Sequence, residues 1–230
     1  MKQLIINGIQ IEIEKKKIKN MYLRVLPPDG RVCISAPNRM TDAEIKRFAL
    51  SRLEWIEHHQ TKLQDRHIDA EMKFVTGENI SVWGKKYQLE IVNSGFKGKV
   101  KIEGDRLLLQ VKESSTSEQR KRTLDECYRE ALKQEIPLLI EKWEKIIGVK
   151  ANAWSIRDMK TRWGTCNIRE KKICLNMQLA KKPPKCLEYV VVHELVHLLE
   201  RSHNSVFKAY MSRFLPEWKA IKAELNGREQ

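Results

Sequence analysis

The chain has 230 residues, which is enough for one large domain or two small ones with separate hydrophobic cores. With 41% hydrophobic and 32% charged residues it has the composition of a globular protein, which excludes an intrinsically disordered chain. The formal net charge of +14 is spread over both halves of the sequence, as is typical of a solvated basic surface. The same surplus also suits a nucleotide or nucleic-acid partner.

Five cysteines are present without a Cys-x-x-Cys pair, so neither a disulfide framework nor a cysteine zinc ribbon is expected. The first residues alternate apolar and polar side chains, unlike the apolar core of a signal peptide. No segment reaches the roughly 18 apolar residues of a membrane span. We therefore expect a cytoplasmic protein with no membrane partner.

Extended segments dominate the first 115 residues. Alternating apolar and polar residues predict strands near residues 4–6, 9–13, 21–26, 31–34, 80–83 and 87–92, and two more within 99–111 around a turn at 103–105. Asn7-Gly8 is a favoured two-residue hairpin turn between the first two of them. Thr41 and Glu44 form a capping-box pattern, which predicts one helix in this part of the chain. We detect no internal repeat.

The pattern changes to helices after a polar segment at residues 113–117. Helices are predicted at residues 118–147, at 185–201 and from 204 onward, with short strands near 153–157 and 172–177. We therefore expect an α+β fold with two domains. Residues 1–115 form a β-rich N-terminal region with one helix, and residues 116–230 form a compact domain around a small sheet.

The segment His193-Glu194-Leu195-Val196-His197 contains the residues that we expect to bind a metal ion and to transfer a proton. On a helix, residues four apart lie on one face, so His193 and His197 can bind one zinc ion. Glu194 lies one position round the helix, where it can take a proton from a water molecule that zinc activates. The surrounding residues are almost all apolar, so the helix is expected to be buried, and buried histidines and a glutamate need a partner such as a metal ion.

A catalytic zinc site commonly has three protein ligands, and two residues are candidates for the third. His203 follows His197 by six residues, the spacing of the extended metzincin motif, although Glu200 replaces the turn glycine of that motif and no Met-turn follows. Glu217 follows His197 by 20 residues, as a glutamate ligand does in gluzincin-type proteases. We favour His203, because Glu217 also fits a solvated acid at a helix start.

The order of motifs in the second half resembles the YgjP-like metal-dependent hydrolases, relatives of the SprT-like and WLM zinc peptidases. The matching segments are Arg162-Trp163-Gly164-Thr165-Cys166, Ile173-Cys174-Leu175-Asn176, Tyr189 to His197, His203 to Phe207, and Pro216-Glu217-Trp218. Thr165 stands where that family usually has serine, which keeps the hydroxyl group. The N-terminal strands, helix and Trp83-Gly84 also fit, so the resemblance covers nearly the whole chain.

The resemblance implies a compact gluzincin-like catalytic domain in which His193, His197 and His203 bind zinc and Glu194 is the general base. It also implies a strand beside the active-site helix that receives the substrate as an added strand. The substrate-binding candidates are Arg162, Trp163, Asn176 and Tyr210. Tyr210 could stabilise a developing oxyanion, or pack in an apolar stripe with Phe207 and Phe214.

Three functions follow from these observations. The first is a zinc-dependent metallopeptidase that acts on a peptide or protein. The second is a metal-dependent hydrolase of nucleotide phosphoanhydrides, in which Arg157, Lys160 and Arg162 hold phosphate oxygens. The third is a nucleic-acid-associated module with a structural zinc ion, which Glu194 argues against, because a structural site needs no base.

Overall fold

The computed structural model describes residues 2–26, 29–53, 55–57, 59–60, 63, 72–94 and 98–227. The fold is α+β, as expected, and the chain divides into two compact units. The first comprises Met1–Met72 with Asn226–Gln230, and the second comprises Lys73–Leu225. The domain boundary expected after residue 115 lies inside the second unit and stays a prediction.

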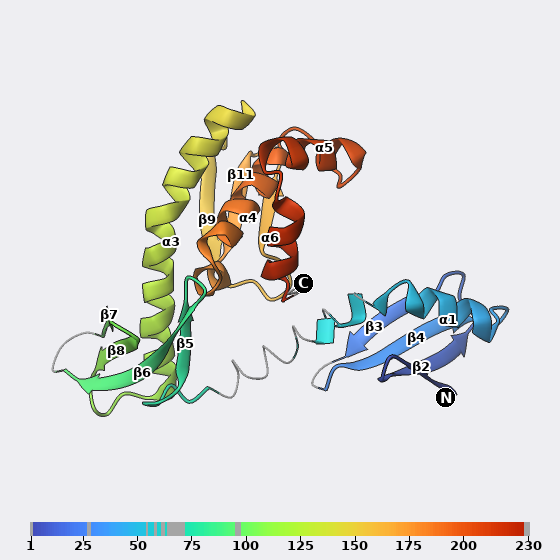
Figure 1. The fold of residues 1–230 in the computed structure, drawn as a ribbon, viewed down its shortest axis with the longest axis horizontal. Helices are drawn as coiled ribbons and strands as arrows, with labels where there is room; N and C mark the ends of the chain where they lie inside the picture. The colour runs from blue at the N-terminus through green and yellow to red at the C-terminus, as the bar shows by residue number, and fades with distance from the viewer. Residues whose placement is uncertain are drawn as a thin grey trace. The chain divides into compact units, whose positions relative to one another are not determined.

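A four-stranded sheet and a helix over residues 42–50 lie in the first unit, in which residues 53, 55–57, 59–60 and 63 are also helical (Figure 1). The strands are β1 (Lys2–Ile6), β2 (Ile9–Lys16), β3 (Tyr22–Leu26) and β4 (Arg31–Pro37), in the order β1-β2-β4-β3. The central pair β2 and β4 is parallel, and both outer pairs are antiparallel. Alternate residues of the strands are buried with Ile45 and Ala49 of α1 (Asp42–Leu50), which begins at the expected Thr41–Glu44 capping box.

A second four-stranded sheet opens the second unit. Its strands are β5 (Asn79–Val82), β6 (Lys85–Asn93), β7 (Lys99–Glu103) and β8 (Arg106–Val111), in the order β5-β6-β8-β7. β6 and β8 are parallel, and the outer pairs are again antiparallel. The long helix α3 (Ser117–Ile147) follows and begins at a capping box made by Thr116 and Gln119. α3 contacts β7 and β8 and then η1 and α4, which accounts for the grouping of this sheet with the rest of the unit.

The two sheets repeat one topology, which we did not detect in the sequence. Each begins with a hairpin whose two turn residues have positive φ: 48° and 79° at Asn7-Gly8, and 50° and 80° at Trp83-Gly84. Each has the same strand order and parallel central pair, and each leads into a helix with a capping box. The repeat is preserved in turn conformation and strand order rather than in side-chain identity, so sequence comparison misses it.

A three-stranded sheet and four helical segments complete the second unit. The strands are β9 (Ala153–Arg157), β10 (Gly164–Asn167) and β11 (Lys172–Asn176), in the order β10-β11-β9, so β10 is an edge strand. The helical segments are η1 (Met177–Lys181), α4 (Pro184–Val196), α5 (Ser205–Phe214) and α6 (Trp218–Leu225). Two expectations were wrong in detail: the helix expected at 185–201 ends at Val196, and β10 was not predicted.

Helix α4 is the centre of the second unit, because it contacts α3, α5, α6, β10 and β11 (Figure 1). Most of its residues are buried, as the apolar sequence predicts. All five cysteines are free thiols. In the described part of the chain, no helix has both the length and the apolar character that a membrane span requires. The cytoplasmic location stays a prediction.

Candidate metal centre and active site

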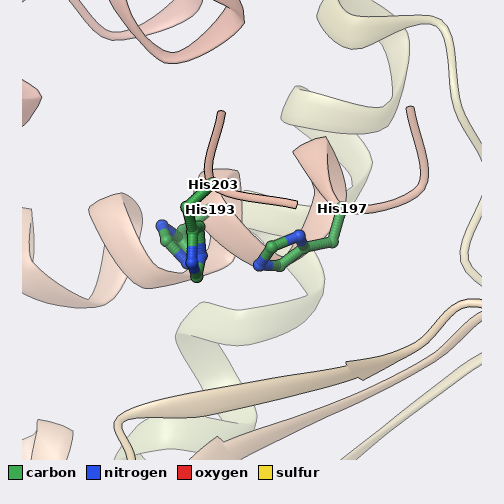
Figure 2. A group of neighbouring side chains, drawn as sticks. All are labelled: His193, His197 and His203. Atoms are coloured by element: carbon green, nitrogen blue, oxygen red, sulfur yellow. The ribbon is translucent and has the colours of Figure 1, made fainter. Parts of the chain in front are cut away.

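Three histidines meet at the C-terminal end of α4 (Figure 2). α4 places His193 and His197 one helical turn apart, with their ring centroids 4.9 Å from each other. His203 comes from the loop before α5, and its Nε2 atom lies 2.9 Å from Nε2 of His193. The candidate ligand nitrogens of the three side chains all lie within 4.8 Å of one another. Among the described residues, this is the one group of three or more potential metal ligands.

Glu217, the alternative third ligand, is not part of this group. It is exposed and lies just before α6. The pKa of Lys185, at the start of α4, is raised mainly by its hydrogen bond with Glu224 and also by the charge of Glu217. Glu217 therefore lies near the N-terminal end of α4, whereas the histidines lie at its C-terminal end.

The three imidazoles fit a divalent metal ion such as zinc. Burial, followed by the neighbouring His197 and His203, lowers the pKa of His193 to about 3, so this ring is neutral and can donate a lone pair. Its Nδ1 atom is buried and has no hydrogen-bond partner among the residues that the structure describes. Nδ1 of His197 lies 3.1 Å from the carbonyl oxygen of Glu200, which leaves Nε2 free for a metal. Ligand nitrogens at about 2.1 Å from a tetrahedral zinc ion are roughly 3.4 Å apart, so the two Nε2 atoms at 2.9 Å would separate slightly to hold one.

Glu194, the residue that follows His193 on α4, carries a buried carboxyl group, with only 4% of its surface exposed. Burial raises its pKa from 4.5 to about 8, and the charge of Arg162 opposes this shift. A carboxyl group with such a pKa can both accept and release a proton near neutral pH. The pKa values of Cys166 and Tyr189 are both raised, mainly by burial and in addition by the negative charge of Glu194.

The edge strand β10 approaches Glu194 at a glycine. A Cβ atom on Gly164 would lie 2.5 Å from Oε1 of Glu194 and 2.9 Å from a methyl group of Val190. No other residue type fits there without displacing the carboxylate. Gly164 therefore allows the strand to lie directly against α4.

The structure gives the four predicted substrate-binding residues different surroundings. Arg162 is exposed just before β10 and acts on Glu194 through its charge. The Trp163 ring lies 5.9 Å from Nζ of Lys182. Tyr210 stacks on Phe214 at 6.0 Å between ring centroids, which favours the packing role for this residue.

Asn176 is buried and organises the loop before β10. Its Nδ2 group donates to the carbonyl oxygens of Met159 and Arg162, both at 2.7 Å. Its Oδ1 atom accepts from the backbone N–H groups of Met159 and Gln178. These bonds point to a positioning role for Asn176 in place of direct contact with substrate.

Sequence reasoning missed the role of Phe207, which it placed only in an apolar stripe. The buried ring lies 4.7–4.9 Å from the centroids of all three imidazoles. Asn204 caps α5 by accepting a hydrogen bond from the Phe207 backbone N–H, and this bond fixes the residue next to the triad. The position four residues after His203 is the only sequence signal for this contact.

A cluster of three histidines with a buried carboxyl group on the same helix as two of them is typical of a metal-dependent hydrolase. The YgjP-like metallopeptidase domain matches residues 19–228, so the chain belongs to the YgjP-like family and is a metallohydrolase.

Solved structures with partial similarity include two metallopeptidase zymogens. Abylysin from Pyrococcus abyssi is 22% identical, with 40% of this chain and 93% of that chain covered and a TM-score of 0.38. Jannalysin from Methanocaldococcus jannaschii is 18% identical, with 40% and 95% covered and a TM-score of 0.36. No curated protein matches the chain.

Proposed function

We propose that the protein is a zinc-dependent metallopeptidase in which His193, His197 and His203 hold the metal and Glu194 is the general base. One observation carries this proposal: three imidazoles converge at the end of α4, the helix that also carries the buried carboxyl group of Glu194. The metallopeptidase family of the chain makes a peptide or protein the expected substrate.

When bound, zinc supplies Lewis acidity, which polarises the scissile carbonyl group and makes water more acidic. The Glu194 carboxylate takes a proton from the attacking water and passes it to the leaving nitrogen. Its raised pKa makes it a stronger base than an exposed glutamate. The Glu200 carbonyl holds the His197 ring by Nδ1 and thereby orients Nε2.

Strand β10 supports an extended peptide as the substrate. It is the edge of its sheet, where an added strand can form backbone hydrogen bonds. Gly164, its first residue, touches Glu194, so a peptide paired with β10 would pass close to the base. Arg162 and Trp163 precede this strand and are the best-placed side chains for contacting such a peptide.

The reaction is tested by offering a peptide library and nucleoside triphosphates to the protein and to Glu194→Gln. We expect the protein to cleave peptides and the variant to lose at least about 100-fold in rate while still binding zinc. Triphosphate hydrolysis that depends on Glu194, without peptide cleavage, would overturn the peptidase proposal in favour of phosphoanhydride hydrolysis. The comparisons lend no support to a nucleic-acid partner, and we do not propose one.

The ligands are tested by zinc content after dialysis. His193→Ala, His197→Ala and His203→Ala should each bind less than one equivalent, because each removes one of three protein ligands. Glu217→Ala is the matched control and should retain full zinc. Full occupancy in His203→Ala together with loss in Glu217→Ala would show that Glu217 is the third ligand.

A further inference from the structure

The hairpin turn of the second sheet holds a segment of the catalytic region. The Trp83 backbone N–H donates to the Ala180 carbonyl at 2.7 Å, and the Gly84 N–H donates to the Lys181 carbonyl at 3.2 Å. A Cβ atom on Gly84 would lie 2.7 Å from Cγ of Pro183, so the proline ring packs directly on the glycine. The turn thus binds a short segment by two backbone hydrogen bonds and one proline contact.

The repeated topology places an equivalent turn in the first sheet at Asn7-Gly8. Its φ angles of 48° and 79° are within two degrees of those at Trp83-Gly84. Both Asn7 and Gly8 are exposed, and a Cβ atom on Gly8 would meet nothing within 4 Å. Within the described ranges of the chain, no backbone carbonyl accepts a hydrogen bond from either turn N–H group. The first turn thus has the backbone conformation of the second, but no described segment of the chain is bound to it.

A cavity of about 460 Å³ lies beside this turn, and charged residues form part of its lining. Its lining includes Gly8, Ile9 and Gln10 from the hairpin, with the carboxylates of Glu12 and Asp29 and one cation, Arg31. Arg31 lies 3.7 Å from Glu12 and offsets part of the negative charge. The lining therefore carries a small net negative charge within a protein of net charge +14. The segment held by the second turn, Ala180-Lys181-Lys182-Pro183, is basic, which is the complementary sign.

We propose that the turn Asn7-Gly8 and the adjoining cavity form a docking site for a basic, proline-containing segment of another protein. The segment would present two backbone carbonyls to the Asn7 and Gly8 N–H groups and a proline ring to the Gly8 Cα atom. The Glu12 and Asp29 carboxylates would face its lysines. The site is separate from the metal centre and does not depend on the hydrolase activity.

The probe is a synthetic peptide with the sequence of Met177 to Lys185, which contains the segment that the second turn binds. It is titrated into the ¹⁵N-labelled full-length protein, and the backbone amide signals are followed. We expect concentration-dependent shifts at Asn7 and Gly8, because both N–H groups gain an acceptor, and none at the Gly104 turn. Gly8→Asn should weaken binding at least about fivefold, since asparagine tolerates the left-handed conformation while its side chain fills the proline position.

Gly104→Asn is the matched control, because Gly104 also has a positive φ and open space at its Cβ position. It should leave the affinity unchanged. In the peptide, Pro183→Ala should weaken binding, whereas Pro184→Ala should not, and this pair needs no change in the protein. The proposal is overturned if millimolar peptide leaves the Asn7 and Gly8 signals unmoved, if both glycine variants weaken binding equally, or if the two peptide variants bind alike.

Discussion

At the scale of single residues, Glu194 is an ionisable side chain in a buried position. Its pKa of about 8 in the folded chain lies above the ordinary value of 4.5. The folded state therefore keeps a proton that the unfolded state has already released between these two values. The stability that this proton provides is complete below pH 4.5 and is lost as the pH rises towards 8.

We therefore expect Glu194→Gln to stabilise the metal-free protein at pH 8. Each pKa unit corresponds to about 1.4 kcal/mol, so the gain should reach a few kcal/mol at pH 8 and nearly vanish at pH 4.5. Urea unfolding in the presence of a chelator measures both values. Glu217→Gln, at an exposed site, is the control for the change from glutamate to glutamine itself. Equal effects of Glu194→Gln at both pH values would contradict the assignment.

Phe207 should affect metal affinity without binding the metal. Its ring packs on all three imidazoles and limits their rotation. Phe207→Leu should weaken zinc binding by roughly 10- to 100-fold, as measured by competition with a chromophoric chelator. Phe214→Leu, which removes a ring that stacks on Tyr210, should bind zinc like the unaltered protein. Unchanged zinc affinity in Phe207→Leu would show that α4 and the loop before α5 hold the three histidines in place without the Phe207 ring.

Three of the residues that the sequence singled out share one property. His193, Glu194 and His197 lie within one helical turn, so helical spacing alone brings them together. Gly164 and Phe207 belong to other elements, and their contacts with the site arise only from packing. Asn176 was predicted to bind substrate, which stays a prediction, and its hydrogen bonds to the loop before β10 could not be predicted from a local pattern.

At the scale of elements, the contact between β10 and α4 limits which residues can replace Gly164. An added methyl group would lie 2.5 Å from Oε1 of Glu194, so the carboxylate or the strand must move. Gly164→Ala should therefore lower the rate of peptide hydrolysis by at least about tenfold, since misplacement of a catalytic group by about an ångström has large effects.

Zinc content in Gly164→Ala should remain full, because no contact between Gly164 and a metal ligand is involved. Thr165→Ala is the matched control, since successive strand residues point to opposite faces. Normal activity in Gly164→Ala would show that β10 can shift without disturbing the base.

At the scale of the whole molecule, hydrophobic periodicity predicted most strands and helices. The strands at residues 79–111 fit the β-rich pattern of the first sheet, and the boundary predicted after residue 115 rests on this pattern. Their grouping with the catalytic region depends on contacts between residues about a hundred positions apart, such as Trp83 with Ala180. Hydrophobic periodicity carries no information about such contacts.

Helix α3 links the two ends of the second unit, since its 31 residues contact β7 and β8 and then η1 and α4. A continuous helix of this length couples the folding of the elements that it touches, so the second sheet and the metal centre should unfold in one cooperative transition. A ligand that binds only the folded state would then stabilise every element of this unit by thermodynamic linkage. Zinc captured by His193, His197 and His203 would slow hydrogen exchange in β7 and β8, which contribute no ligand to the ion.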